Sequence, residues 1–223
     1  MKPVRAGKPV PFNRDRPDLP AQLEQIGDPN EVFEQTDFIT IEKKRVQDLD
    51  RSSLRIDVFR VSDSLLERVH LAGGEFGSAV WKDSRLIGCD LANIRAHRIA
   101  LVRVEFVDCR LTGFRATAVD WQDVLIENGE MSFCQLSGGR FRTCEFDRCD
   151  WRDADLQKAD LSGSVFRSCN LARADLRAAR LQNTDFRKSE VDGMVVGVSD
   201  LQGAIVDPAQ AMVFARLMGL KIT

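Results

Sequence analysis

Apolar residues recur at every fifth position from Leu71 to Val206, an unbroken run of 28 positions. The position two residues earlier forms a second column, in which 20 of the 28 residues are Gly, Ala, Ser, Thr or Cys. An α-helix or a β-strand would spread a period of five over all its faces, so neither could bury one column continuously. The pattern therefore predicts an internal repeat in which the chain turns every five residues.

Four such turns would close a square coil of about 20 residues, and parallel coils stacked about 4.8 Å apart would bury both columns. On this spacing residues 71–210 would form about seven coils, a rod of roughly 34 Å. The residue volumes agree with this interior. The large column shrinks to Ala96 and Ala116 where the small column enlarges to Ile94 and Phe114, as close packing requires.

The repeat unit is clearest in residues 154–163 and 174–178, where it reads A(D/N)LXX. This motif resembles that of the pentapeptide repeat family, and the resemblance extends over about two thirds of the chain. It implies an all-β fold, a right-handed quadrilateral β-helix, to which the sequence adds a short C-terminal capping helix.

The chain divides into four parts by this reading. Residues 1–32 hold six of the seven prolines and are expected to form a mobile or loosely docked arm. Residues 33–70 would be atypical starting coils, residues 71–207 the regular solenoid, and residues 208–223 a C-terminal helix and tail. Within the starting coils Leu49, Leu54 and Phe59 are in step, whereas Leu66 resumes the period two residues late. A bulge or loop near residues 61–65 is expected to absorb this shift.

The C-terminal helix has clear boundaries in the sequence. Asp207 can cap it, Pro208 suits its first turn, and Gly219 ends it. Because the segment is apolar nearly all round, we expect one side to cap the last coil and the other to meet a second subunit. The candidate dimer-interface residues are Met212, Val213, Phe214, Leu217 and Met218. The resemblance points the same way, since family members implicated in quinolone resistance dimerise through C-terminal elements.

The chemistry-bearing residues favour a protein that is not an enzyme. The six cysteines, which are Cys89, Cys109, Cys134, Cys144, Cys149 and Cys169, all lie in the small inward column. Core filling is the favoured interpretation, and redox or metal use is the alternative. With only His70 and His97, and no nucleophile motif, no catalytic set, cofactor or metal site is predicted. His97 lies near arginines that either bind an anion or form a solvated basic patch.

Charge and hydropathy limit the possible partners. Lys and Arg number 32 against 34 Asp and Glu, for a net charge of -2, so direct nucleic-acid binding is not expected. The sequence has neither an apolar stretch long enough for a membrane span nor a recognisable secretory signal, and we expect a cytoplasmic protein.

One local group of charges is a candidate partner site. Five acidic residues fall on one predicted wall across three successive rungs: Glu105, Asp108, Glu127, Glu145 and Asp147. They are called the acidic patch below. The leading hypothesis is a rigid, non-catalytic protein-interaction surface with an unidentified partner. The alternative, implied by the resemblance, is a DNA mimic that binds DNA gyrase or another type II topoisomerase and protects it from quinolone-like poisons. No wall carries charge as dense as DNA, which has one phosphate per roughly 1.7 Å.

Overall fold

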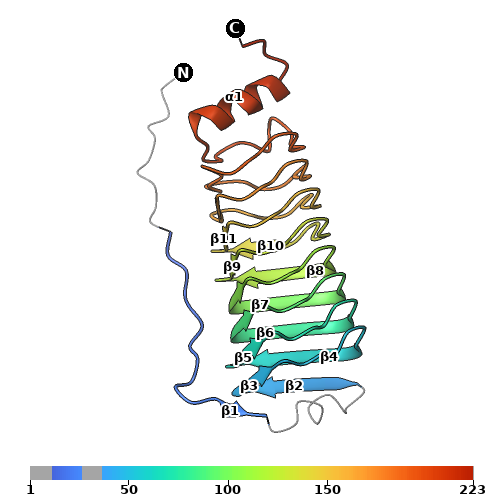
Figure 1. Ribbon diagram of the computed structural model, residues 1–223. Helices are drawn as coiled ribbons and strands as arrows, with labels where there is room; N and C mark the ends of the chain where they lie inside the picture. The colour runs from blue at the N-terminus through green and yellow to red at the C-terminus, as the bar shows by residue number, and fades with distance from the viewer. Residues whose placement is uncertain (1–11, 27–36, 223) are drawn as a thin grey trace.

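The computed structural model describes residues 12–26 and 37–222. They form a square β-solenoid closed at one end by a helix, with the N-terminal segment running alongside the stacked coils (Figure 1). The predicted β-helix with a C-terminal helix is confirmed. No helix among the described residues is long and apolar enough to cross a membrane.

The strands of the described residues form one parallel sheet that winds around the solenoid. Their bounds are β1 Glu24–Gln25, β2 Phe38–Glu42, β3 Lys44–Gln47, β4 Arg55–Ser62, β5 Leu65–Glu67, β6 Glu75–Ile87, β7 Arg95–Val107, β8 Arg115–Gln122, β9 Leu125–Glu127, β10 Arg140–Arg142, β11 Glu145–Asp147 and β12 Val165–Arg167. The helix α1 spans Pro208–Leu217.

The pairing register is constant along the solenoid. Phe38 pairs with Val58 in the first coil, and Phe146 pairs with Phe166 much further along. Each of these pairs is separated by 20 residues, which is four repeats of five. A residue therefore lies directly over the equivalent residue of the preceding coil, and the sequence column becomes a physical column.

The corners of the square depend on a backbone conformation that side chains seldom adopt. The residue two positions after the large column is left-handed at most corners, for example Asp108 with φ 55° and Gly138 with φ 69°. In the first half of the solenoid one corner per coil has no such residue, and β6 and β7, of 13 residues each, continue across it. From Gly138 to Gly193 every fifth residue has a positive φ. The second half therefore turns at every corner and has only short strands.

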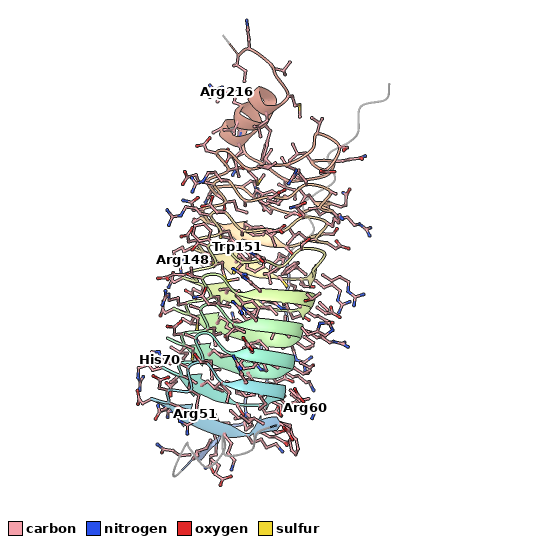
Figure 2. The ribbon with its side chains drawn as sticks, turned by 90° about the vertical axis from the view of Figure 1, so that its right-hand side faces the viewer. Arg51, Arg60, His70, Arg148, Trp151 and Arg216 are labelled. Carbon is pink, nitrogen blue, oxygen red and sulfur yellow. The ribbon has the colours of Figure 1, made fainter. Side chains whose placement is uncertain are left out.

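The interior is filled by the two predicted columns, including all three tryptophans. Figure 2 shows Trp151 within the stack of coils and Arg148 on its outer surface. Phe146 lies over Phe166 with ring centroids 4.7 Å apart, and Phe166 stacks on Phe186 at 5.2 Å. Such ring pairs add to the stabilisation from burial alone.

The predicted frame shift before residue 66 is wrong. Val61 pairs with Trp81 and Leu66 with Leu86, the same 20-residue spacing as elsewhere, so no residue is inserted between them. Leu49 and Phe59 are buried in the column that is usually small. The large column continues without a break in register and contains Val46, Val61 and Leu66.

The described residues cover the first coil in part and the last coil with a helix. At the first coil β1 pairs with β3, so that Glu24 lies beside Lys44. At the last coil Asp207 caps α1, as predicted, and also forms a capping box with Gln210. The buried Gln210 side chain donates hydrogen bonds to the carbonyls of Phe186 and Ser189 at 2.5 and 2.6 Å. The Phe186 carbonyl also accepts from the Ser189 N–H, so Gln210 adds a second donor there and supplies a donor to the Ser189 carbonyl at the end of the sheet.

Candidate protein-binding surface

The five residues of the acidic patch lie on one wall, as the sequence predicted. In one outward column Glu105, Leu125 and Glu145 occupy successive coils. In the neighbouring column Glu127 follows Val107 and precedes Asp147. The carboxylates therefore alternate with apolar side chains on a rigid parallel sheet.

Most of this negative charge is compensated within the molecule. Glu145 forms an ion pair with Arg167 at 2.7 Å, while Arg148 contacts both Glu127 at 2.5 Å and Asp147 at 2.8 Å. Asp108 accepts a hydrogen bond from the Asn128 side chain at 2.8 Å. The patch is consequently a network of paired charges. It does not present the open row of anions that a mimic of the DNA backbone needs.

Apolar side chains accompany these charges. Ile87, Val107 and Leu125 are partly exposed on the same wall, whereas Val165, further along the column of Leu125, is buried. A surface that mixes half-buried apolar groups with charged groups resembles the rim and centre of a protein interface.

The described part of the N-terminal arm, residues 12–26, lies against the solenoid near this patch. The Arg14 guanidinium contacts the Glu105 carboxylate at 2.7 Å and the Asp123 carbonyl at 3.4 Å. The backbone N–H of Asp15 donates to Asp123, and that of Asp18 donates to Asp83, each at 3.4 Å. The sequence predicts a mobile or loosely docked arm over residues 1–32. The structure docks residues 12–26, whereas residues 1–11 and 27–32 lie outside the described part.

The corner beneath the arm is defined here by Asp83, Arg103, Glu105 and Asp123 and is called the docking corner. Arg103 donates two hydrogen bonds of 2.6 Å to the buried Asp83 carboxylate. Burial by itself would raise the pKa of Asp83. The hydrogen bonds from Arg103 and from the Asp18 N–H outweigh burial, and the pKa of Asp83 is lowered from its usual value. The carboxylate is therefore held in its ionised form.

Comparison with known proteins agrees with this geometry. A family model described as pentapeptide repeats matches residues 134–173 and 169–190, with eight copies of the repeat. Residues 134–190 therefore consist of pentapeptide repeats. The matched residues lie in the part of the solenoid that turns at every corner, where the short repeat is most regular.

A solved structure of low sequence identity is similar in fold. A trypsin-treated form of QnrB1, a plasmid-mediated fluoroquinolone resistance protein, is 20% identical with a TM-score of 0.51, and the match covers 85% of this chain and 100% of QnrB1. HetL, involved in heterocyst differentiation regulation in Nostoc sp. strain PCC 7120, is 14% identical with a TM-score of 0.36, over 76% of this chain and 86% of HetL. No curated protein sequence matches this chain.

The C-terminal helix separates into two sides. Phe214 is 4% exposed and contacts the core, and Val213 packs partly against it. These two candidate interface residues therefore belong to the cap. Met212, Leu217 and Met218 are 46–50% exposed, and a cavity of about 230 Å³ opens beside Phe214 and Met218. The exposed apolar surface at this end includes these three residues together with Leu220 and Ile222.

The thiols of the repeat protein lie in the interior. All six cysteines are free and buried. Burial raises the pKa of Cys134 and Cys144 to about 12, which keeps these thiols protonated and unreactive. Among the described residues no group of three His, Cys, Asp or Glu side chains is placed to hold a metal ion. Core filling is the role that this geometry supports.

The arginines near His97 line a shallow depression on another wall. The Glu75 carboxylate lies 3.4 Å from Arg55 and 3.6 Å from Arg95, so a carboxylate of the protein itself already contacts two of the arginines. The geometry thus favours the solvated basic patch over an anion site.

Proposed function

We propose that this protein is a rigid, non-catalytic scaffold that binds a protein partner through the wall carrying the acidic patch. The observation that supports it is the register of that wall, where carboxylates and apolar side chains alternate over three coils. The parallel sheet fixes these groups before binding, so little conformational entropy is lost on association. The existing ion pairs are exposed in part and contribute little to folding stability, so their carboxylates can exchange arginines of this chain for cations of a partner.

The test is affinity capture from the native host with two charge-reversed variants. Glu127→Lys/Glu145→Lys reverses two carboxylates of the patch. Glu130→Lys/Glu190→Lys makes the same charge change on another wall. Glu130 and Glu190 belong to one column of paired residues there, with Asp150 and Asn170 between them. We expect a captured protein that is lost with the first variant and retained with the second. Equal capture by both variants would exclude the acidic patch as the binding site.

We further propose that the protein forms a homodimer through the exposed side of α1. The support is the apolar surface at Met212 and Leu217, which are 47% and 50% exposed in the single chain, an arrangement typical of a contact site. Light scattering of Met212→Asp/Leu217→Asp should give half the mass of the parent protein. A parent protein that already has the mass of one chain would refute the dimer. Phe214 is unsuitable for this test because its substitution would disrupt the cap.

A second candidate function is binding to a type II topoisomerase. QnrB1 is described as a fluoroquinolone resistance protein, and resemblance to quinolone-resistance members implies DNA gyrase as a partner. The acidic patch favours this function, while its pairing with Arg148 and Arg167 disfavours mimicry of DNA. A supercoiling assay with purified gyrase, with and without a fluoroquinolone, tests it. Absence of both inhibition and protection would eliminate this candidate.

A further inference from the structure

The arm places one arginine in an unusually enclosed site at the docking corner. The side chain of Arg14 is 6% exposed and that of its partner Glu105 is 13% exposed. Glu105 also receives Arg85 at 3.5 Å from the preceding coil. This carboxylate therefore lies between two guanidinium groups, one of which comes from a segment 91 residues earlier in the chain.

The backbone of the arm is held by carboxylates at a regular spacing. Asp83 and Asp123 occupy equivalent positions two coils apart, since Lys82 pairs with Val102 and Val102 with Gln122. Two coils span about 9.6 Å. The amides that they bind, those of Asp15 and Asp18, are three residues apart, and an extended chain of three residues spans at most about 10–11 Å. The corner thus fits any extended backbone, and only the arginine contact is specific to a side chain.

The arm is an imperfect occupant of this corner. None of residues 12–26 is fully buried. The buried Nε atom of Arg14 has no hydrogen-bond partner among the described residues, and a buried donor without a partner weakens the net stabilisation that a contact provides. A segment whose arginine was better satisfied could therefore displace the arm.

We propose that the docking corner is a binding site for an extended, arginine-bearing segment of a protein partner, and that residues 12–18 occupy it as an intramolecular competitor. Glu105 belongs to both the docking corner and the acidic patch, so release of the arm removes the Arg14 cation from the patch. The proposal rests on the proposed function in that the partner is a protein. It adds that the partner presents an extended segment with an arginine, and that residues 12–18 of the arm compete with this segment for the docking corner.

The experiment uses the full chain and a fluorescein-labelled peptide with the sequence of residues 12–20. The chains are the parent, Arg14→Gln, Arg16→Gln and Arg14→Gln/Glu105→Gln. Arg16 is an exposed arginine of the same arm, so its variant is a control with the same charge change. Fluorescence polarisation measures peptide affinity, hydrogen exchange measures protection of residues 12–26, and thermal melts verify that each variant is folded.

We expect Arg14→Gln to deprotect the arm and to bind the peptide at least tenfold more tightly than the parent or Arg16→Gln. The added Glu105→Gln change should abolish this gain. An arm that stays protected in Arg14→Gln, equal peptide affinity in all chains, or a gain that survives Glu105→Gln would each overturn the proposal. Because the peptide assay requires no native partner, its failure is distinguishable from failure of the capture experiment.

Discussion

Replacing Phe114 by alanine tests whether the two inward columns are packed as a single interior. Phe114 is 1% exposed and occupies the column that is usually small, next to Ala116 in the column that is usually large. Removing a fully buried phenylalanine side chain costs about 3–5 kcal/mol. For a protein of this length 1 kcal/mol corresponds to about 2–4 °C, so the melting temperature should fall by roughly 6–20 °C.

The reciprocal changes make this prediction more demanding. Ala116→Phe alone should cost about 1–3 kcal/mol because it overfills the coil. Phe114→Ala/Ala116→Phe restores the usual order of small and large residues and should be more stable than Phe114→Ala alone. The assay is thermal unfolding followed by circular dichroism. The control is Phe133→Ala, since Phe133 is 58% exposed and its loss should cost within about 0.5 kcal/mol. If Phe114→Ala matched this control, or the double variant lost the sum of the single losses, the packing argument would be refuted.

Three further predictions concern the thiols, the charges and the cap. None of the six cysteines should react with a thiol reagent in the folded protein, and all six should react in denaturant without reductant. The melting temperature should be constant from pH 7 to 5 and fall below about pH 4. The pKa of Asp83 is lower in the folded protein than its value of about 3.9 in the unfolded chain, so the ionised carboxylate stabilises the fold above that pH and this stability is lost as the pH falls through the folded pKa. A decline between pH 7 and 5 would contradict this. Gln210→Leu should accelerate hydrogen exchange in the last coil, because the carbonyls of Phe186 and Ser189 each lose the hydrogen bond that the Gln210 side chain donates. Unchanged exchange would show that the cap does not depend on these bonds.

The regular solenoid was predictable because its determinants are local and repeated. Leu71 to Val206 keep one period, and the structure converts it into a 20-residue register without exception among its strand pairs. The starting coils were misread for a physical reason. Leu49, Leu54 and Phe59 fill the small column with large residues, while Arg51 stands in the large column. The five-residue spacing of large residues therefore follows the small column up to Phe59 and the large column from Leu66 onward, which resembles a frame shift.

The surface was predictable only in part. The 20-residue register places Glu105 beside Arg85 and brings Glu145 near Arg167, so these pairs could have been found from the sequence once the coil was known. The contact between Arg14 and Glu105 could not, because no periodicity connects the arm to the coils. The arm is placed by long-range polar contacts whose spacing becomes visible only when the coils are stacked.

The central claim is that the wall of the acidic patch binds a protein partner. The most direct measurement is quantitative capture from the native host by the parent chain, Glu127→Lys/Glu145→Lys and Glu130→Lys/Glu190→Lys. The account predicts a protein captured by the parent and by the second variant and lost with the first. A captured protein that binds all three chains equally would contradict it.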